Sequence, residues 1–127
     1  MRTLTIKDES ATGSILNELL LRFESEYITV KELIEARVKE EVRKYEQNVE
    51  SYKNGLILPT NLEARLNKKS TPKIDVEEQL YIALNAFQKN GFFILVDDEQ
   101  VERLDQKVFI DPATQVSFIK LTALVGG

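Results

Sequence analysis

Two glycines, Gly126 and Gly127, close the sequence directly after the apolar stretch 121–125, and they are the residues best suited to chemistry. Glycine has no side chain, so a terminal glycine carboxylate can pass through a narrow channel of a partner enzyme. There it can be activated by ATP as an acyl-adenylate and passed to a sulfur or an amine. Such a chain needs no nucleophile or base, because its reactive group is its own carboxyl end.

The residue types that usually carry catalysis are missing. The chain has no cysteine and no histidine, which excludes disulfides, thiolate zinc sites, cysteine nucleophiles and the commonest general base. The remaining glycines, Gly13, Gly55 and Gly91, are scattered, so no phosphate-binding loop is present. We therefore expect a protein that is not an enzyme, with no catalytic residue, metal site or cofactor of its own.

Acidic residues occur in two groups. Asp97, Asp98 and Glu99 lie where a hairpin tip is expected, and we interpret them as turn residues. A magnesium site there is the alternative, but no third ligand has a matching spacing. Glu40 and Glu41 are expected on the polar face of a helix.

Length and charge bound the class of protein. The chain has 127 residues, 43% of them hydrophobic and 30% charged, which is typical of one globular domain. A net charge of −4 argues against nucleic acid as a partner. No apolar run approaches the roughly 20 residues of a membrane helix, and the N-terminus lacks a secretory pattern. We expect a cytoplasmic protein with no membrane partner.

The first third of the chain predicts a hairpin and a helix. Alternating apolar residues over 3–7 and 15–23 indicate two strands, joined by the turn-rich segment 8–14. Thr29 and Glu32 form a capping box, so a helix should begin there and end between residues 45 and 53. Its apolar stripe has helical spacing and consists of Val30, Leu33, Ile34, Val38, Val42 and Tyr45.

The rest of the chain predicts a polar segment over 47–73 with a short helix over 61–67, and then more regular structure. Asp75 and Glu78 form another capping box, which opens a helix that Asn90 and Gly91 end. Strands are expected at 92–96, 99–104, 106–110 and 116–124, with a turn at 111–114.

This order of elements predicts an α+β fold rather than a doubly wound sheet, because strands and helices do not alternate regularly. A helix should cross one face of a mixed sheet. It would bury one strand face against its own stripe, namely Leu19, Leu21 and Phe23 against Ile34, Val38 and Val42.

Two stretches carry a family resemblance. "TLTIKD…ILNELLLRFESEYITVKELIEARVKEEV" resembles the opening of ubiquitin-like β-grasp proteins, and "FFILVDDEQVERLDQKVFIDPATQVSFIKLTALVGG" resembles the sulfur carriers of molybdopterin and thiamine biosynthesis. The chain is also similar to bacterial ubiquitin-like modifiers. The resemblance covers about 2–45 and 92–127. It leaves 46–91 as an insertion, and the residues before the glycines (Ala123, Leu124 and Val125) include no basic one.

The resemblance implies one β-grasp domain over 1–127, with a flexible tail at 125–127 and the last strand parallel to the first. It also implies that an activating enzyme adenylates Gly127 with ATP, that conjugating enzymes pass it to a target amine, and that Val125 and Leu124 dock the tail. Two alternatives stay open. In the first alternative, the protein is a sulfur carrier with a C-terminal thiocarboxylate. In the second, it is an interaction module in which the glycines are incidental.

Overall fold

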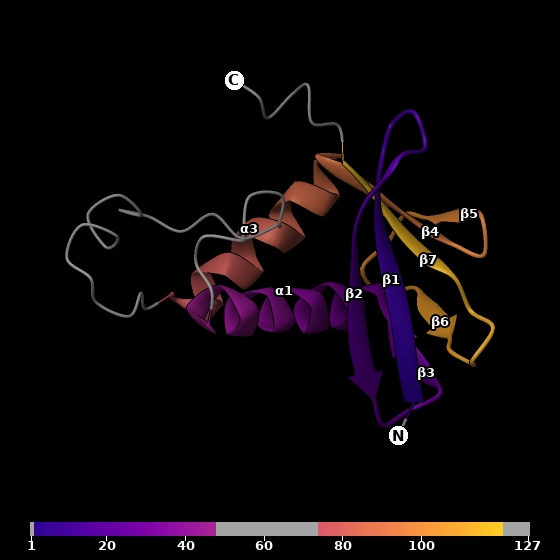
Figure 1. Cartoon of the computed structure of the whole chain (residues 1–127), viewed down its shortest axis with the longest axis horizontal. Helices are drawn as coiled ribbons and strands as arrows, with labels where there is room; N and C mark the ends of the chain where they lie inside the picture. Colours follow the sequence, from indigo (N-terminus) through magenta and orange to yellow (C-terminus); the bar gives the residue numbers. More distant parts are fainter. Residues whose placement is uncertain (1, 48–73, 121–127) are drawn as a thin grey trace.

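The computed structural model describes residues 2–47 and 74–120 of the chain. Within these residues the fold is α+β, with two helices, a mixed five-stranded sheet and a separate two-stranded sheet (Figure 1). The elements in chain order are β1 (Arg2–Ser10), β2 (Ile15–Phe23), β3 (Tyr27–Thr29), α1 (Val30–Gln47), α3 (Val76–Gln88), β4 (Phe92–Val96), β5 (Glu99–Val101), β6 (Lys107–Phe109) and β7 (Val116–Lys120).

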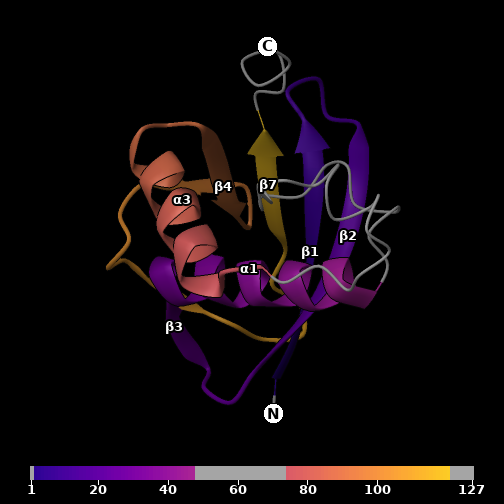
Figure 2. The same cartoon turned by 90° about the vertical axis from the view of Figure 1, so that its left-hand side faces the viewer.

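The five-stranded sheet has the order β2-β1-β7-β4-β5. β1 and β7 pair in parallel, with Asp8 opposite Phe118 and Ser10 opposite Lys120, while the other neighbours are antiparallel. A parallel pair needs a crossover connection. The first strand and the last described strand pair in parallel, as the family resemblance implied. Both helices lie over the same face of the sheet (Figure 2).

The helix α1 begins as its capping box predicts. The backbone N–H of Glu32 donates to the Thr29 hydroxyl over 3.1 Å, and the N–H of Thr29 donates to the Glu32 carboxylate over 2.9 Å. Its apolar stripe is buried together with one face of the hairpin. The part of the core that α1 and the hairpin contribute consists of Leu4, Ile6, Leu19, Leu21, Val30, Leu33, Ile34, Val38, Val42 and Tyr45. Phe23, which we expected in this core, is only partly buried at its edge.

The helix α3 belongs to the same core, although it lies in the segment 46–91 that the resemblance leaves out. Asp75 caps it by accepting a hydrogen bond from the N–H of Glu78 over 3.2 Å, and Asn90 ends it with a φ of 62°. Phe87 lies 5.8 Å from Phe92 between ring centroids. This ring contact ties the end of α3 to β4.

The two-stranded sheet of β3 and β6 was not predicted. The sequence indicated a strand at 106–110 but assigned 27–29 only to the approach to the helix. In the structure Tyr27 pairs with Phe109, and their rings are 5.2 Å apart. Three residues are too few to show a period of two, so this strand has no signal apart from its partner.

Two other expectations concern the ends of elements. The strand expected at 99–104 is shorter and ends at Val101. Of the strand expected at 116–124, β7 covers the part to Lys120, and the remainder lies outside the described residues. The short helix expected at 61–67 also lies outside them. Neither described helix is long and apolar enough to cross a membrane.

Candidate functional site

The residues predicted to carry the chemistry, Gly126 and Gly127 with Leu124 and Val125, lie outside the described part of the chain. The structure instead describes the strand that leads to them. β7 lies in the middle of the five-stranded sheet and ends at Lys120, where the described residues also end. The end of β7 and the side chains packed against it are therefore the described part of the candidate site.

A buried ionic cluster lies against this end of β7. Nη2 of Arg37 donates to one carboxylate oxygen of Asp8 over 2.6 Å, and Nη1 donates to the other. Nε of Arg37 donates to Glu41 over 2.8 Å. The side chains of Arg37 and Glu41 are 0% exposed and that of Asp8 is 2% exposed, so the cluster is closed to solvent.

Sequence reasoning missed this cluster, and two of its expectations were wrong. Asp8 was assigned to the turn after the first strand, but β1 continues to Ser10 and holds Asp8 on its inner face. Glu41 was assigned to the polar face of the helix, but it points inward with Arg37. The available signal was the i,i+4 spacing of Arg37 and Glu41 next to the apolar stripe, which favours an ion pair on one helix face.

The cluster joins three elements, because β7 contributes the ring of Phe118. The guanidinium carbon of Arg37 lies 4.6 Å from the centre of that ring, which is within the range of a cation–π contact. Desolvation acts to lower the pKa of Arg37, but the hydrogen bonds and charges of Asp8 and Glu41 outweigh it and raise the pKa. Arg37 is therefore charged in the folded protein.

Lys120 lies at the end of β7 beside this cluster. Burial lowers its pKa below the usual value of 10.5, and the charge of Arg37 acts in the same direction, while Asp8 and Glu41 oppose it. The cluster cannot touch a substrate because all three of its side chains are buried. It can hold β1, α1 and β7 together at the point where the chain continues toward its glycines.

Neither described helix lies over the opposite face of the sheet (Figure 2). Its outward positions include Leu20 on β2, which is 45% exposed, and three half-buried apolar residues on the central strands. Ile119 of β7 lies opposite Phe93 of β4, and Leu95 lies opposite Ser117. This open face offers an apolar surface close to the end of β7.

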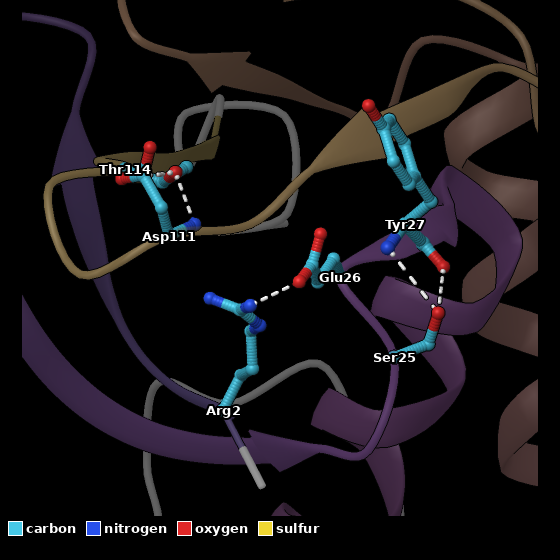
Figure 3. A network of polar contacts seen from close by, with 6 residues as sticks. All are labelled: Arg2, Ser25, Glu26, Tyr27, Asp111 and Thr114. Carbon is cyan, nitrogen blue, oxygen red and sulfur yellow. Dashed lines mark hydrogen bonds and ion pairs between the residues drawn. The ribbon is translucent and has the colours of Figure 1, made fainter.

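The other end of the sheet carries a different network, which Figure 3 shows. Arg2 pairs with Glu26, and both side chains are partly exposed. Nearby, the turn predicted at 111–114 is present, since the N–H of Thr114 donates to the carbonyl of Asp111 over 3.1 Å. Arg2 begins β1 and Lys120 ends the parallel β7, so this network lies at the other end of the sheet from Lys120.

The acidic hairpin tip is a turn. Asp97 and Asp98 both have positive φ values, 50° and 69°, as a two-residue hairpin loop requires. The Asp97 carboxylate also accepts a hydrogen bond from the N–H of Gln115 over 2.9 Å. Among the described residues, no group of three or more acidic side chains is arranged to hold a metal ion.

Comparison with known proteins identifies no relative. No protein-family model, no curated protein and no solved structure matches this chain.

Proposed function

We propose that this protein is a ubiquitin-like modifier with a β-grasp fold, whose Gly127 carboxylate is activated and transferred to an amine of a target protein. One observation carries the proposal. The last described strand, β7, pairs in parallel with β1 in the middle of the sheet, and the sequence after it continues for seven residues to Gly127. The sheet order β2-β1-β7-β4-β5 and the helix across one face support the β-grasp assignment.

The chemistry follows from the carboxylate alone. Gly127 attacks the α-phosphorus of ATP on an activating enzyme and releases pyrophosphate. A thiolate of that enzyme displaces AMP and forms a thioester. A thiolate of a conjugating enzyme then attacks the thioester carbonyl and expels the first thiolate. A lysine amine of the target attacks the thioester carbonyl, loses a proton and expels the thiolate, leaving an amide bond.

The neighbouring residues would guide the tail. Gly126 keeps the chain narrow next to the reacting carboxylate. Val125 and Leu124 give the enzyme channel two apolar side chains to hold. The open sheet face around Ile119 and Phe93 would add a recognition surface for these enzymes, since apolar patches on such faces mark interaction sites. All these partners act in the cytoplasm, where ATP is present.

The test follows the C-terminus by mass spectrometry. The full chain, with Gly127 as its terminus, is incubated with ATP and a lysate of the source cells. Digestion should then yield target peptides in which a lysine carries the residues of the tail. Two variants, one lacking Gly127 and one with an alanine appended after it, should form no adduct while folding normally by circular dichroism.

Other outcomes decide against the modifier. A terminal carboxylate in which sulfur replaces one oxygen, with no protein adduct, identifies a sulfur carrier instead. A chain that forms neither product, or whose adducts persist without Gly127, overturns the proposal and favours an interaction module.

A further inference from the structure

Within the described residues, the five-stranded sheet has two outer edges that pair with no further strand. β2 lies at one edge and β5 at the other, and no described strand pairs with the outer side of either. An unpaired edge presents free backbone N–H and C=O groups and can pair with another chain. β2 has nine residues and contains no proline, and its charged residues are Glu18 and Arg22.

The groove beside the β2 edge is basic. A groove of about 670 Å³ runs between β2 and α1 and includes the apolar residues Leu20, Leu21 and Ala36. Its charged lining residues are Arg22, Lys39, Arg43 and Lys44 against the single acid Glu40. Arg43 forms an ion pair with Glu40. The lining still carries a net positive charge, in a chain whose net charge is −4.

The edge at β5 is acidic. The hairpin tip and the segment that follows β5 expose their carboxylates to solvent. These acids are Asp97, Asp98, Glu99, Glu102 and Asp105, with Arg103 as the one base among them. The two edges of the sheet therefore carry opposite charge.

We propose that copies of this chain associate head to tail, with the acidic β5 edge of one copy against the basic β2 groove of the next. This contact continues the sheet by backbone hydrogen bonds, while opposite charges select the partner edge. Pairing of β2 with β2 of another copy would instead bring two basic grooves together. Because the two surfaces differ, the contact is heterologous and can add further copies.

The contact should be weak and sensitive to salt. β5 offers only three residues for pairing, and most of the contributing charges are exposed. Exposed charges are screened by salt at physiological concentrations. Association should therefore rise with protein concentration and fall when salt is added.

Velocity sedimentation of the full chain over a range of concentrations tests the proposal. The wild-type chain should form a ladder of species that shrinks at high salt. Two variants weaken one edge each: E99K/E102K cancels the net charge of −4 at the β5 edge, and R22Q/K39Q lowers the net charge of the β2 groove from +3 to +1. Each variant should associate with an affinity at least about tenfold lower than that of the wild type. Lys107→Gln on β6 should not change the affinity.

Mixing the two edge variants gives the sharpest result. The intact groove of E99K/E102K can bind the intact acidic edge of R22Q/K39Q, but both remaining edges are weakened. The mixture should therefore stop at a one-to-one dimer. A wild-type chain that stays monomeric overturns the proposal and leaves the groove for an acidic segment of a different protein. Association that neither edge variant weakens, or a mixture that fails to form the dimer, also overturns it.

Discussion

The Arg37 and Arg2 networks lie at opposite ends of the five-stranded sheet, and their surroundings differ. Arg37 is 0% exposed and pairs with Asp8 and Glu41, whereas Arg2 is 33% exposed and pairs with Glu26 alone. Removing one partner from a buried ion pair leaves the other charge buried, where water cannot replace the lost partner. Removing one partner from an exposed pair lets water take its place. Breaking an arginine–carboxylate pair should therefore cost more stability at the Arg37 end than at the Arg2 end.

The difference also concerns which elements the networks connect. Arg37 joins α1 to β1 through Asp8 and to β7 through the ring of Phe118. Arg2 joins the start of β1 to the loop before β3, where the backbone carbonyl of Glu26 already accepts a hydrogen bond from Ile110. We infer that the Arg37 network fixes the end of β7 that leads to the tail, while the Arg2 network adds little to contacts already made.

Replacing Arg37 should have the largest effect. Arg37→Met keeps an unbranched side chain of similar length but removes the guanidinium that both buried carboxylates contact. We expect the free energy of unfolding to fall by about 3–5 kcal/mol, which is the usual cost of breaking a buried ion pair. Urea unfolding followed by circular dichroism measures this loss. A loss below about 1 kcal/mol would mean that water reaches the cluster in solution.

Replacing the whole cluster separates the cost of orphaned charge from the cost of lost packing. In the triple variant Asp8→Val, Arg37→Met and Glu41→Leu, no buried charge of the cluster remains. Its stability should return to within about 2 kcal/mol of the wild type, because apolar replacements of buried ion pairs are often neutral or stabilising. If the triple variant is as unstable as Arg37→Met, the loss of stability comes from lost packing and not from unpaired buried charge.

Lys120 gives the cluster a pH dependence of known sign. Its pKa is lowered in the folded state, so at pH values below 10.5 the unfolded chain binds more protons at this residue. Stability should therefore rise with pH as the solution passes from the lowered pKa toward 10.5. The variant Lys120→Met removes this contribution, and the difference in unfolding free energy from the wild type should shrink or change sign over that range. A difference that is constant with pH would show that Lys120 is fully solvated.

Much of the fold was predictable from the sequence, because its signals are local. The capping boxes at Thr29 and Asp75 fixed two helix starts, and apolar alternation identified both strands of the hairpin. The strand β3 was missed because its three residues form a strand only through pairing with β6. The partner strand is about 80 residues away in sequence, and no local pattern reports such a contact.

The candidate site was harder to predict for a related reason. Charged residues such as Asp8 and Glu41 are normally exposed, and that rule placed them in a turn and on a polar face. Their burial depends on Arg37 lying between them, which combines residues of β1 and α1 that are 29 positions apart. The apolar stripe of α1 predicted which face of the helix packs against the sheet, but it did not predict the ionic contact on that face.

Breaking the exposed Arg2–Glu26 pair should have the smallest effect on the free energy of unfolding. Arg2→Ala removes the ion pair with Glu26, and we expect a loss of only about 0–1 kcal/mol in the free energy of unfolding, as for other exposed pairs. Glu26→Ala should cost a similar amount. The double variant should cost less than the sum of the two by no more than about 1 kcal/mol, because each single variant already removes the same weak ion pair. Urea unfolding of the three variants measures these values. A coupling energy between Arg2 and Glu26 above about 1.5 kcal/mol would show that this pair, too, is shielded from water, and exposure would then not explain the difference between the two ends.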